Sequence, residues 1–299
     1  MLTQDITYRD GATSLRGFLA YDEMASDRRP GVVVVHEGLG LNEHAMARAR
    51  MIAGLGYVAL AADMFGDRRQ AGDLQEARAL IAPLRDDPPK LRARGRAALA
   101  ALAALPHVDA GRLGAIGFCF GGTVVLELAR DGADLKAVVS FHGVLTTKAP
   151  AVAGRTKAGV LVCTGADDPL APPDQVMAFE AEMRAAGVED WQVISYGGTL
   201  HGFTNPAADG SILPSARYNE TADRRSWQAM GSFLAERSPE DGSGLSRRRR
   251  QEPVDGRDPD IAGGLDRQAV TFAQPPPALE IGQGLQGDQH RLALRFRQG

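Results

Sequence analysis

The stretch Gly31-Val-Val-Val-Val-His36 is the clearest guide to the fold of this chain. Four consecutive β-branched residues predict a strand, and a run that is apolar at every position is typical of a strand buried on both faces. Such strands occur mostly in parallel sheets that helices cover on each side. The stretch therefore predicts a protein of the α/β class.

Strand and helix patterns alternate on either side of this stretch. We expect an N-terminal hairpin from residues 6–8 and 14–21, and strands over 57–61, 113–118, 136–141, 159–163 and 191–196. Helices are expected over 43–55, 90–105, 121–130, 173–186 and 222–236. Repeated strand-helix units predict a three-layer domain in which a mostly parallel, doubly wound sheet is flanked by helices.

The chain divides into two parts by composition. We expect residues 1–237 to form the α/β domain, a length that suits one domain of this class. From residue 238 the sequence is rich in Gly, Asp and Pro, contains four successive arginines over 247–250, and lacks sustained periodicity. We expect 238–299 to be a disordered, low-complexity tail. Its arginine run is either a solvated cluster or a binding site for an acidic partner.

Charge and hydropathy narrow the range of partners. The formal net charge of −3 gives no overall basic field, so we expect neither nucleic acid nor a membrane surface as partner, and a small molecule instead. No apolar run approaches the roughly 18 to 20 residues that cross a bilayer, and the first residues do not have the pattern of a signal peptide. We therefore expect a cytoplasmic protein that is a monomer or a homodimer.

Cys119 lies where a predicted strand runs directly into a predicted helix. Small residues on both sides of it, Gly117 and Gly121, match the nucleophile-elbow pattern with cysteine in place of serine. The helix directs its first amides toward the sulfur, which favours a thiolate and stabilises an oxyanion. A buried, unreactive cysteine is the alternative. An acid and a histidine further along the chain favour the nucleophile.

The acid and the histidine follow later strands in the order expected for a hydrolase triad. Asp167 and Asp168 come directly after one predicted strand, and His201 lies in a glycine-flanked loop after the next. Because the carboxyl ends of parallel strands meet at one sheet edge, these groups are expected near Cys119. Asp168, which precedes Pro169, is the preferred acid, and Asp167 is the alternative. His201 is the expected general base.

Three further residues belong to the same predicted edge. Glu37 directly follows the first parallel strand, so we expect it near Cys119. It either holds the proton or charge of the resting thiol or binds loop amides, and the residues alone leave both roles open. The backbone amides of Gly38 and Phe120 are candidates for an oxyanion hole. Phe120 is the stronger candidate because it follows the nucleophile.

Other histidines and glycines near these strand ends do not predict a metal or a nucleotide site. His36 and His142 also follow predicted strands, and we expect a structural role for both. His36-Glu37 is followed by Gly40 where a zinc-binding helix would need its second histidine, and no phosphate-binding loop occurs. We expect neither a metal nor a cofactor.

Four motifs occur in the chain in a fixed order: His-Glu-Gly-Leu-Gly-Leu-Asn over 36–42, Gly-Phe-Cys-Phe-Gly-Gly over 117–122, the loop of Asp168, and His-Gly-Phe over 201–203. Together they resemble the dienelactone hydrolase family of the α/β-hydrolase superfamily, the carboxymethylenebutenolidase-like enzymes, over about residues 3–236. The resemblance implies an α/β-hydrolase fold and a triad of Cys119, His201 and Asp168. It also implies that Glu37 helps to activate the thiol.

The resemblance also concerns the substrate, because the founding enzyme of the family holds a substrate carboxylate with arginines. One of these arginines lies four residues after the catalytic histidine, where this chain has Asn205. We therefore do not expect the dienelactone itself to be the substrate. The second arginine belongs in or near residues 67–85, and its candidates are Arg68, Arg69, Arg78 and Arg85.

Two functions of different classes follow from these residues. The first is hydrolysis of a small ester or lactone, in which Cys119 attacks the carbonyl group and water resolves a thioester. The second is a non-catalytic ligand-binding or redox-sensing protein that uses an activated Cys119 thiol. Cys163 falls inside a predicted buried strand, which is a poor position for a resolving cysteine, so hydrolysis is the preferred hypothesis.

Overall fold

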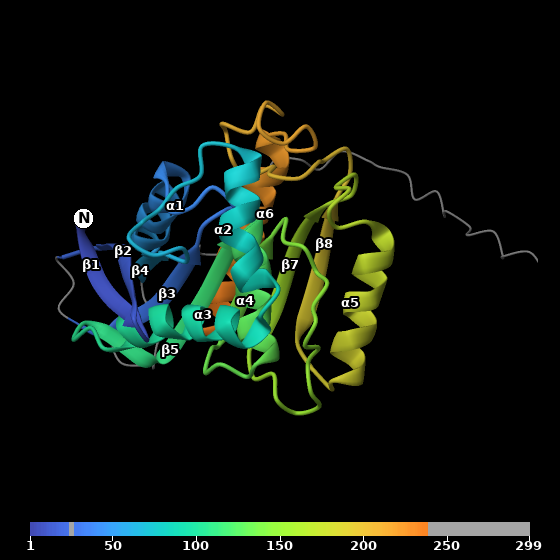
Figure 1. Ribbon diagram of the computed structural model, residues 1–299. Coiled ribbons are helices and arrows are strands. Elements are labelled where there is room, and N and C mark those ends of the chain that lie inside the picture. Colours follow the sequence, from blue (N-terminus) through green and yellow to red (C-terminus); the bar gives the residue numbers. More distant parts are fainter. Residues whose placement is uncertain (24–26, 239–299) are drawn as a thin grey trace, which may run out of the picture. The chain divides into compact units, whose positions relative to one another are not determined.

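The computed structural model describes residues 1–23 and 27–238. In this part of the chain, one sheet of eight strands lies between helices on both faces (Figure 1). This arrangement confirms the predicted α/β fold with its mostly parallel sheet. The tail expected from residue 238 onward lies outside the described residues, except for Ser238 itself.

The sheet has the strand order β1-β2-β4-β3-β5-β6-β7-β8. The hairpin of β1 and β2 runs antiparallel to β4, whereas all neighbouring strands from β4 to β8 are parallel. The strands are β1 (Leu2–Asp10), β2 (Thr13–Tyr21), β3 (Arg29–Val35), β4 (Val58–Ala62), β5 (Val108–Phe118), β6 (Ala137–Phe141), β7 (Gly159–Gly165) and β8 (Trp191–Tyr196).

Two hydrophobic cores fill the space between the sheet and its helices. One face of the sheet packs against α1 and α6, and the other packs against α3, α4 and α5. The side chains of Val33 and Val35 on β3 enter one core, and those of Val32 and Val34 enter the other. This alternation explains why the strand is apolar at every position. The helices are α1 (Glu43–Gly54), α2 (Leu74–Arg85), α3 (Pro88–Ala103), α4 (Phe120–Arg130), α5 (Pro173–Ala185) and α6 (Glu220–Arg237).

Helix α2 is the one element of the described part that the sequence patterns did not predict. Pro83 lies in its last turn, and a proline inside a helical pattern usually marks its end. Its start does carry a capping signal, because the Asp73 side chain accepts a hydrogen bond from the Glu76 amide, while the Glu76 carboxylate accepts one from the Gly72 amide. The helix forms one wall of the candidate site described below.

The parallel strands bring their carboxyl ends to a common edge of the sheet. The loops that follow β3, β5, β7 and β8 carry the polar residues of interest, and α4 begins at the same edge. Ligands of doubly wound sheets bind at this edge. None of the helices in the described ranges combines the length and apolar character of a membrane span.

Candidate active site

The backbone of Cys119 adopts a strained conformation between β5 and α4. Its φ of 52° is a left-handed value, which is uncommon for any residue other than glycine. A Cβ atom on Gly117 would lie 2.0 Å from the Gly121 carbonyl oxygen, and one on Gly121 would lie 2.2 Å from the Val35 carbonyl oxygen. Glycine is therefore required on both sides of the turn, as in the sequence pattern.

Hydrogen bonds from a neighbouring strand hold this turn in place. The Cys119 N–H lies 2.9 Å from the Phe141 carbonyl oxygen and 3.1 Å from His142 Nδ1. His142 is fully buried, and burial lowers its pKa well below the usual value, so the ring is neutral. Because Nδ1 accepts a hydrogen bond, Nε2 carries the hydrogen and donates it to Thr204 Oγ1 at 2.8 Å. His142 thus supports the Cys119 backbone.

The acid and the histidine of the predicted triad lie within hydrogen-bond distance of each other. His201 Nδ1 is 2.8 Å from Asp168 Oδ2, and both residues are buried. The other oxygen of Asp168 accepts a hydrogen bond from the Leu170 amide at 2.8 Å. Asp167, the alternative acid, is exposed. This geometry favours Asp168 as the residue that orients His201.

The electrostatic environment of His201 favours its charged form. Burial on its own lowers the pKa of this imidazole, but its interactions with Cys119 and Asp168 raise it to about 10. The Nε2 atom is buried and has no hydrogen-bond partner among the described residues. His201 can therefore hold a proton beside the sulfur, and Nε2 is free to exchange it with a reacting group.

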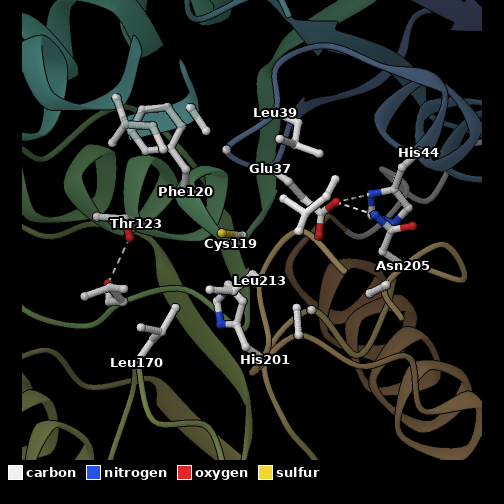
Figure 2. A pocket seen from close by; sticks show the side chains of 18 of the residues that line it. Glu37, Leu39, His44, Cys119, Phe120, Thr123, Leu170, His201, Asn205 and Leu213 are labelled. Atoms are coloured by element: carbon white, nitrogen blue, oxygen red, sulfur yellow. Dashed lines mark hydrogen bonds and ion pairs between the residues drawn. The ribbon is translucent and has the colours of Figure 1, made fainter. Parts of the chain in front are cut away.

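Glu37 lies at the same cavity as Cys119 and His201 (Figure 2). Its Oε2 atom accepts a hydrogen bond from Asn205 Nδ2 at 2.6 Å and lies 3.5 Å from His44 Nδ1. Burial raises the pKa of Glu37, although the hydrogen bond from Asn205 opposes this shift. The structure thus places the carboxyl group against two uncharged or weakly basic partners, and none of the arginines in residues 1–23 and 27–238 binds it directly.

The two predicted oxyanion donors are the first residue of α4 and a residue of the loop after β3. Phe120 begins α4, so its N–H has no acceptor within the helix, and Phe120 lines the cavity together with Gly38. The dipole of α4 adds positive potential at this end. Both amides remain candidates for the oxyanion hole.

His36 has a structural environment rather than a position at the cavity. Its Nδ1 donates to the Glu37 carbonyl oxygen at 2.6 Å, and its Nε2 accepts from the Met64 amide at 3.3 Å. Burial lowers the pKa of His36, so this ring is neutral. It joins the loop after β3 to the residues that follow β4.

The cavity has a volume of about 1230 Å³. Cys119 and His201 line the cavity together with residues of α1, α2, α4 and the loops after β6 and β8. The apolar residues that line it include Leu39, Leu74, Ile81, Leu91, Phe120, Val144, Leu170, Ile212 and Leu213. A cavity of this size and character suits an organic molecule with an apolar body.

The structure separates the four arginine candidates into two pairs. Arg68 donates to Asp5 and to the Gly17 carbonyl oxygen, and Arg69 donates to the Phe65 carbonyl oxygen, so both serve loop structure. Arg78 and Arg85 lie on α2 and line the cavity with exposed side chains. Only this second pair could meet a substrate group.

Two further residues, which contact each other through His44 Nε2 and the Thr204 carbonyl oxygen, have no signal that the sequence analysis used. His44 lies in the first turn of α1, outside the strand ends, and Thr204 lies beyond the His-Gly-Phe motif. Both come to the site only through packing of α1 and of the loop after β8. Within the described ranges, no group of three or more His, Cys, Asp or Glu side chains converges to hold a metal ion.

The parallel sheet, the strained turn at Cys119 and the acid and histidine at later strand ends define an α/β-hydrolase. Residues 15–238 match the sequence model of the dienelactone hydrolase family. The chain therefore belongs to the dienelactone hydrolase family and is a hydrolase of that type.

Several individual proteins are similar to this chain. A dienelactone hydrolase-like promiscuous phosphotriesterase from metagenomic libraries has a similar structure, with a TM-score of 0.76, 46% sequence identity, and coverage of 79% of this chain and 98% of that one. An uncharacterised protein of Caenorhabditis elegans is 40% identical over 149 residues, which cover 49% of this chain and 94% of the relative. A carboxymethylenebutenolidase homolog of Mus musculus is 26% identical over 123 residues, which cover 41% of this chain and 49% of that protein.

Proposed function

We propose that this protein hydrolyses small esters or lactones through a Cys119-His201-Asp168 triad. The observation that carries the proposal is the 2.8 Å contact between His201 and Asp168, which directs the free Nε2 atom of the imidazole toward the cavity and toward Cys119. An oriented base beside a nucleophile at a helix N-terminus is the arrangement required for acyl transfer.

The proposed reaction has two steps. His201 Nε2 takes the proton of the Cys119 thiol, and the thiolate attacks the substrate carbonyl carbon, while the Phe120 and Gly38 amides stabilise the oxyanion. His201 then gives its proton to the leaving alcohol, and a thioester remains on Cys119. In the second step a water molecule, deprotonated by His201, attacks the thioester, which releases the acid and restores the thiol.

A redox-sensing role for Cys119 has weaker support. Cys163, the second cysteine, is fully buried in β7, and burial raises the pKa of its thiol to about 12. Tyr196 contacts its sulfur at 3.9 Å. A thiol in this environment is a poor resolving partner because the thiolate is the reactive form.

The walls near the nucleophile favour a neutral substrate. Asn205 is uncharged and already binds Glu37, so it offers no cation to a substrate carboxylate. The apolar lining of the cavity suits an acyl or alcohol group without charge. Arg78 and Arg85 lie on α2, where they could meet a polar end of a longer substrate.

Hydrolysis of neutral phosphotriesters is a second candidate function. It is favoured by the uncharged group at Asn205 and by the 46% identity to a relative described as a promiscuous phosphotriesterase. A thiolate at Cys119 would attack the phosphorus atom instead of a carbonyl carbon, the phenol or alcohol would leave with a proton from His201, and water would then cleave the phosphorus–sulfur bond.

The proposed function is tested by hydrolysis assays on the purified chain. We expect turnover of short-chain nitrophenyl esters and of simple lactones, and loss of this turnover after one equivalent of iodoacetamide alkylates Cys119. A substrate present in excess should slow the alkylation because both compete for the same sulfur. Paraoxon in the same panel tests the second candidate. Turnover that survives complete alkylation of Cys119 would contradict both mechanisms.

Replacing Asn205 by arginine is expected to shift substrate preference toward anionic esters. The new guanidinium would face the cavity near Glu37 and pair with a substrate carboxylate, which is worth about a tenfold change in relative kcat/KM for one charge-assisted hydrogen bond. The measurement is the ratio of kcat/KM for a nitrophenyl half-ester of a dicarboxylic acid to that for nitrophenyl butyrate. Asn205→Gln is the matched control, and an equal ratio in both variants would contradict the expectation.

A further inference from the structure

His36 directly precedes the loop that carries Gly38, one of the two candidate oxyanion donors. Its imidazole is fully buried and has a backbone partner at each nitrogen. Nδ1 lies 2.6 Å from the Glu37 carbonyl oxygen, which can only accept, and Nε2 lies 3.3 Å from the Met64 amide nitrogen, which can only donate. The hydrogen is therefore on Nδ1 and the lone pair on Nε2, so both contacts fix the same neutral tautomer.

The Glu37 carbonyl oxygen belongs to the peptide group that also contains the Gly38 nitrogen. No peptide bond in the described residues is cis, and in a trans peptide the C=O and N–H point in opposite directions. A donor that holds the Glu37 oxygen on one side therefore turns the Gly38 N–H to the other. Within the described loops that N–H donates to no backbone carbonyl oxygen, and Gly38 lines the cavity. The bond from His36 thus helps to set the direction of a free donor at the cavity.

Other hydrogen bonds hold the far end of the same turn. The Gly40 N–H also donates to the Glu37 oxygen, at 3.2 Å, and closes the turn of residues 37–40. The Leu39 carbonyl oxygen accepts from the Ala71 amide at 3.0 Å. Both contacts lie beyond Gly38, and glycine at 38 and 40 gives the backbone of this turn wide conformational freedom. His36 supplies the shorter bond to the Glu37 oxygen and joins the near end of the turn to β3.

The segment after β4 holds the imidazole of His36 in its position. The Met64 N–H binds Nε2, and the Met64 carbonyl oxygen accepts from Arg94 Nη1 at 2.7 Å. The buried Asp63 carboxylate accepts from the Phe65 amide at 2.9 Å, which fixes the same segment. The imidazole therefore connects a firmly bonded segment to the Glu37 carbonyl group.

The second candidate donor lies against the same imidazole. The ring centroids of His36 and Phe120 are 6.3 Å apart, and the Phe65 ring lies 4.9 Å from the first and 5.7 Å from the second. A Cβ atom on Gly121 would lie 2.7 Å from the His36 carbonyl oxygen, so the first turn of α4 contacts the backbone at the end of β3. His36 therefore packs beside both predicted sources of the oxyanion hole.

We propose that His36 is a positioning residue for the oxyanion hole: its Nδ1–H holds the Glu37 carbonyl oxygen and so directs the Gly38 N–H toward the substrate oxygen. Figure 2 shows Glu37 and Leu39, the neighbours of Gly38, at the same cavity as Cys119. In this role the imidazole exchanges no proton and touches no substrate. The role rests on the proposed function, because an oxyanion forms only during acyl transfer. The tautomer of His36 does not depend on that function.

The tautomer is tested first and without a substrate, by NMR of the imidazole nitrogens in the full chain. Protonated and unprotonated ring nitrogens have well separated chemical shifts, and the His36 signals are those that disappear in the His36→Asn variant. At neutral pH we expect a hydrogen on Nδ1 and none on Nε2. A hydrogen on Nε2, or an imidazolium, would overturn the proposal.

Two variants of similar size, His36→Asn and His36→Leu, isolate the bond to Glu37. Both lose the acceptor for the Met64 amide, but the Asn amide nitrogen takes the place of Nδ1 and can donate to the Glu37 oxygen. Relative to His36→Asn, we expect His36→Leu to lower kcat for a nitrophenyl ester by about 10- to 100-fold, with KM changed by less than about threefold. Equal kcat values in the two variants would overturn the proposal.

Alkylation by iodoacetamide separates positioning of the donor from general damage to the site. This displacement at carbon forms no oxyanion, so its rate at Cys119 should be the same within about twofold in wild type and both variants. A loss of alkylation rate in His36→Leu that equals the loss of hydrolysis would place the defect at the Cys119 turn and overturn the proposal.

Two further outcomes remain distinguishable. Circular dichroism checks folding, and if His36→Leu does not fold, His36→Asn is compared with wild type, where a loss in kcat above about tenfold would contradict the proposal. If the wild type hydrolyses no ester while Nδ1 carries the hydrogen, the proposed function fails, and the oxyanion role of His36 fails with it. In that case the NMR result still establishes the bond to Glu37.

Discussion

Ester hydrolysis by the Cys119→Ala variant is expected to fall by about 10³-fold or more in kcat. The reason is that no other nucleophilic side chain occupies the turn between β5 and α4, where the strained backbone and the helix N-terminus direct one sulfur atom at the cavity. Residual turnover would come from binding and from the oxyanion donors alone. The measurement is steady-state hydrolysis of a nitrophenyl ester, with burst kinetics to detect the thioester.

Cys163→Ala is the matched control for this prediction. Cys163 is the other cysteine of the chain, but its side chain is buried in β7 and its thiol remains protonated at neutral pH. Loss of this sulfur leaves a small void, so a modest loss of stability is expected with little change in kcat. Equal activity losses in the two variants would show that Cys119 has no special role.

The Asp168→Asn variant is expected to lose about 10²- to 10⁴-fold in kcat/KM. An amide at this position can donate a hydrogen to His201 Nδ1, which would fix the wrong tautomer and occupy the atom that must carry the hydrogen. Asp168 also raises the pKa of His201, so its loss should lower the pKa of the imidazole. The alkaline limb of the pH–rate profile, where the imidazolium loses its proton, should therefore move to lower pH.

Asp167→Asn provides the comparison for Asp168. The two residues are adjacent and chemically identical, but Asp167 is exposed and Asp168 is buried against His201. We expect Asp167→Asn to change kcat/KM by less than about twofold, as is usual for an exposed residue away from the chemistry. A larger loss in Asp167→Asn than in Asp168→Asn would reverse the assignment of the acid.

Much of the fold was accessible from the sequence because strong local patterns coincide with the elements. The apolar run at 31–36 could only be buried on both faces, and the glycines around Cys119 are dictated by backbone contacts of 2.0 and 2.2 Å. Helix α2 was missed because Pro83 interrupts its pattern. Strand β5 begins at Val108, five residues before the predicted start, since Gly111 and polar neighbours obscure its first half.

The candidate site was accessible only in part. The rule that parallel strands end at one edge brought Cys119, Asp168 and His201 into the prediction. His44 could not be found in this way, because it lies on a helix and reaches Glu37 through packing of α1. The arginines near α2 could not be separated either, since their roles depend on the loop contacts of Arg68 and Arg69.

The origin of the cavity walls has a consequence for engineering. The proposed nucleophile, base and acid are fixed by the ends of sheet strands, whereas part of the cavity wall comes from α2 and from residues 205–213, which contribute no strand to the sheet. Mutational libraries confined to these two segments should therefore explore new substrates at small risk to folding. The same separation would allow natural selection to diversify substrate range while the catalytic framework stays unchanged.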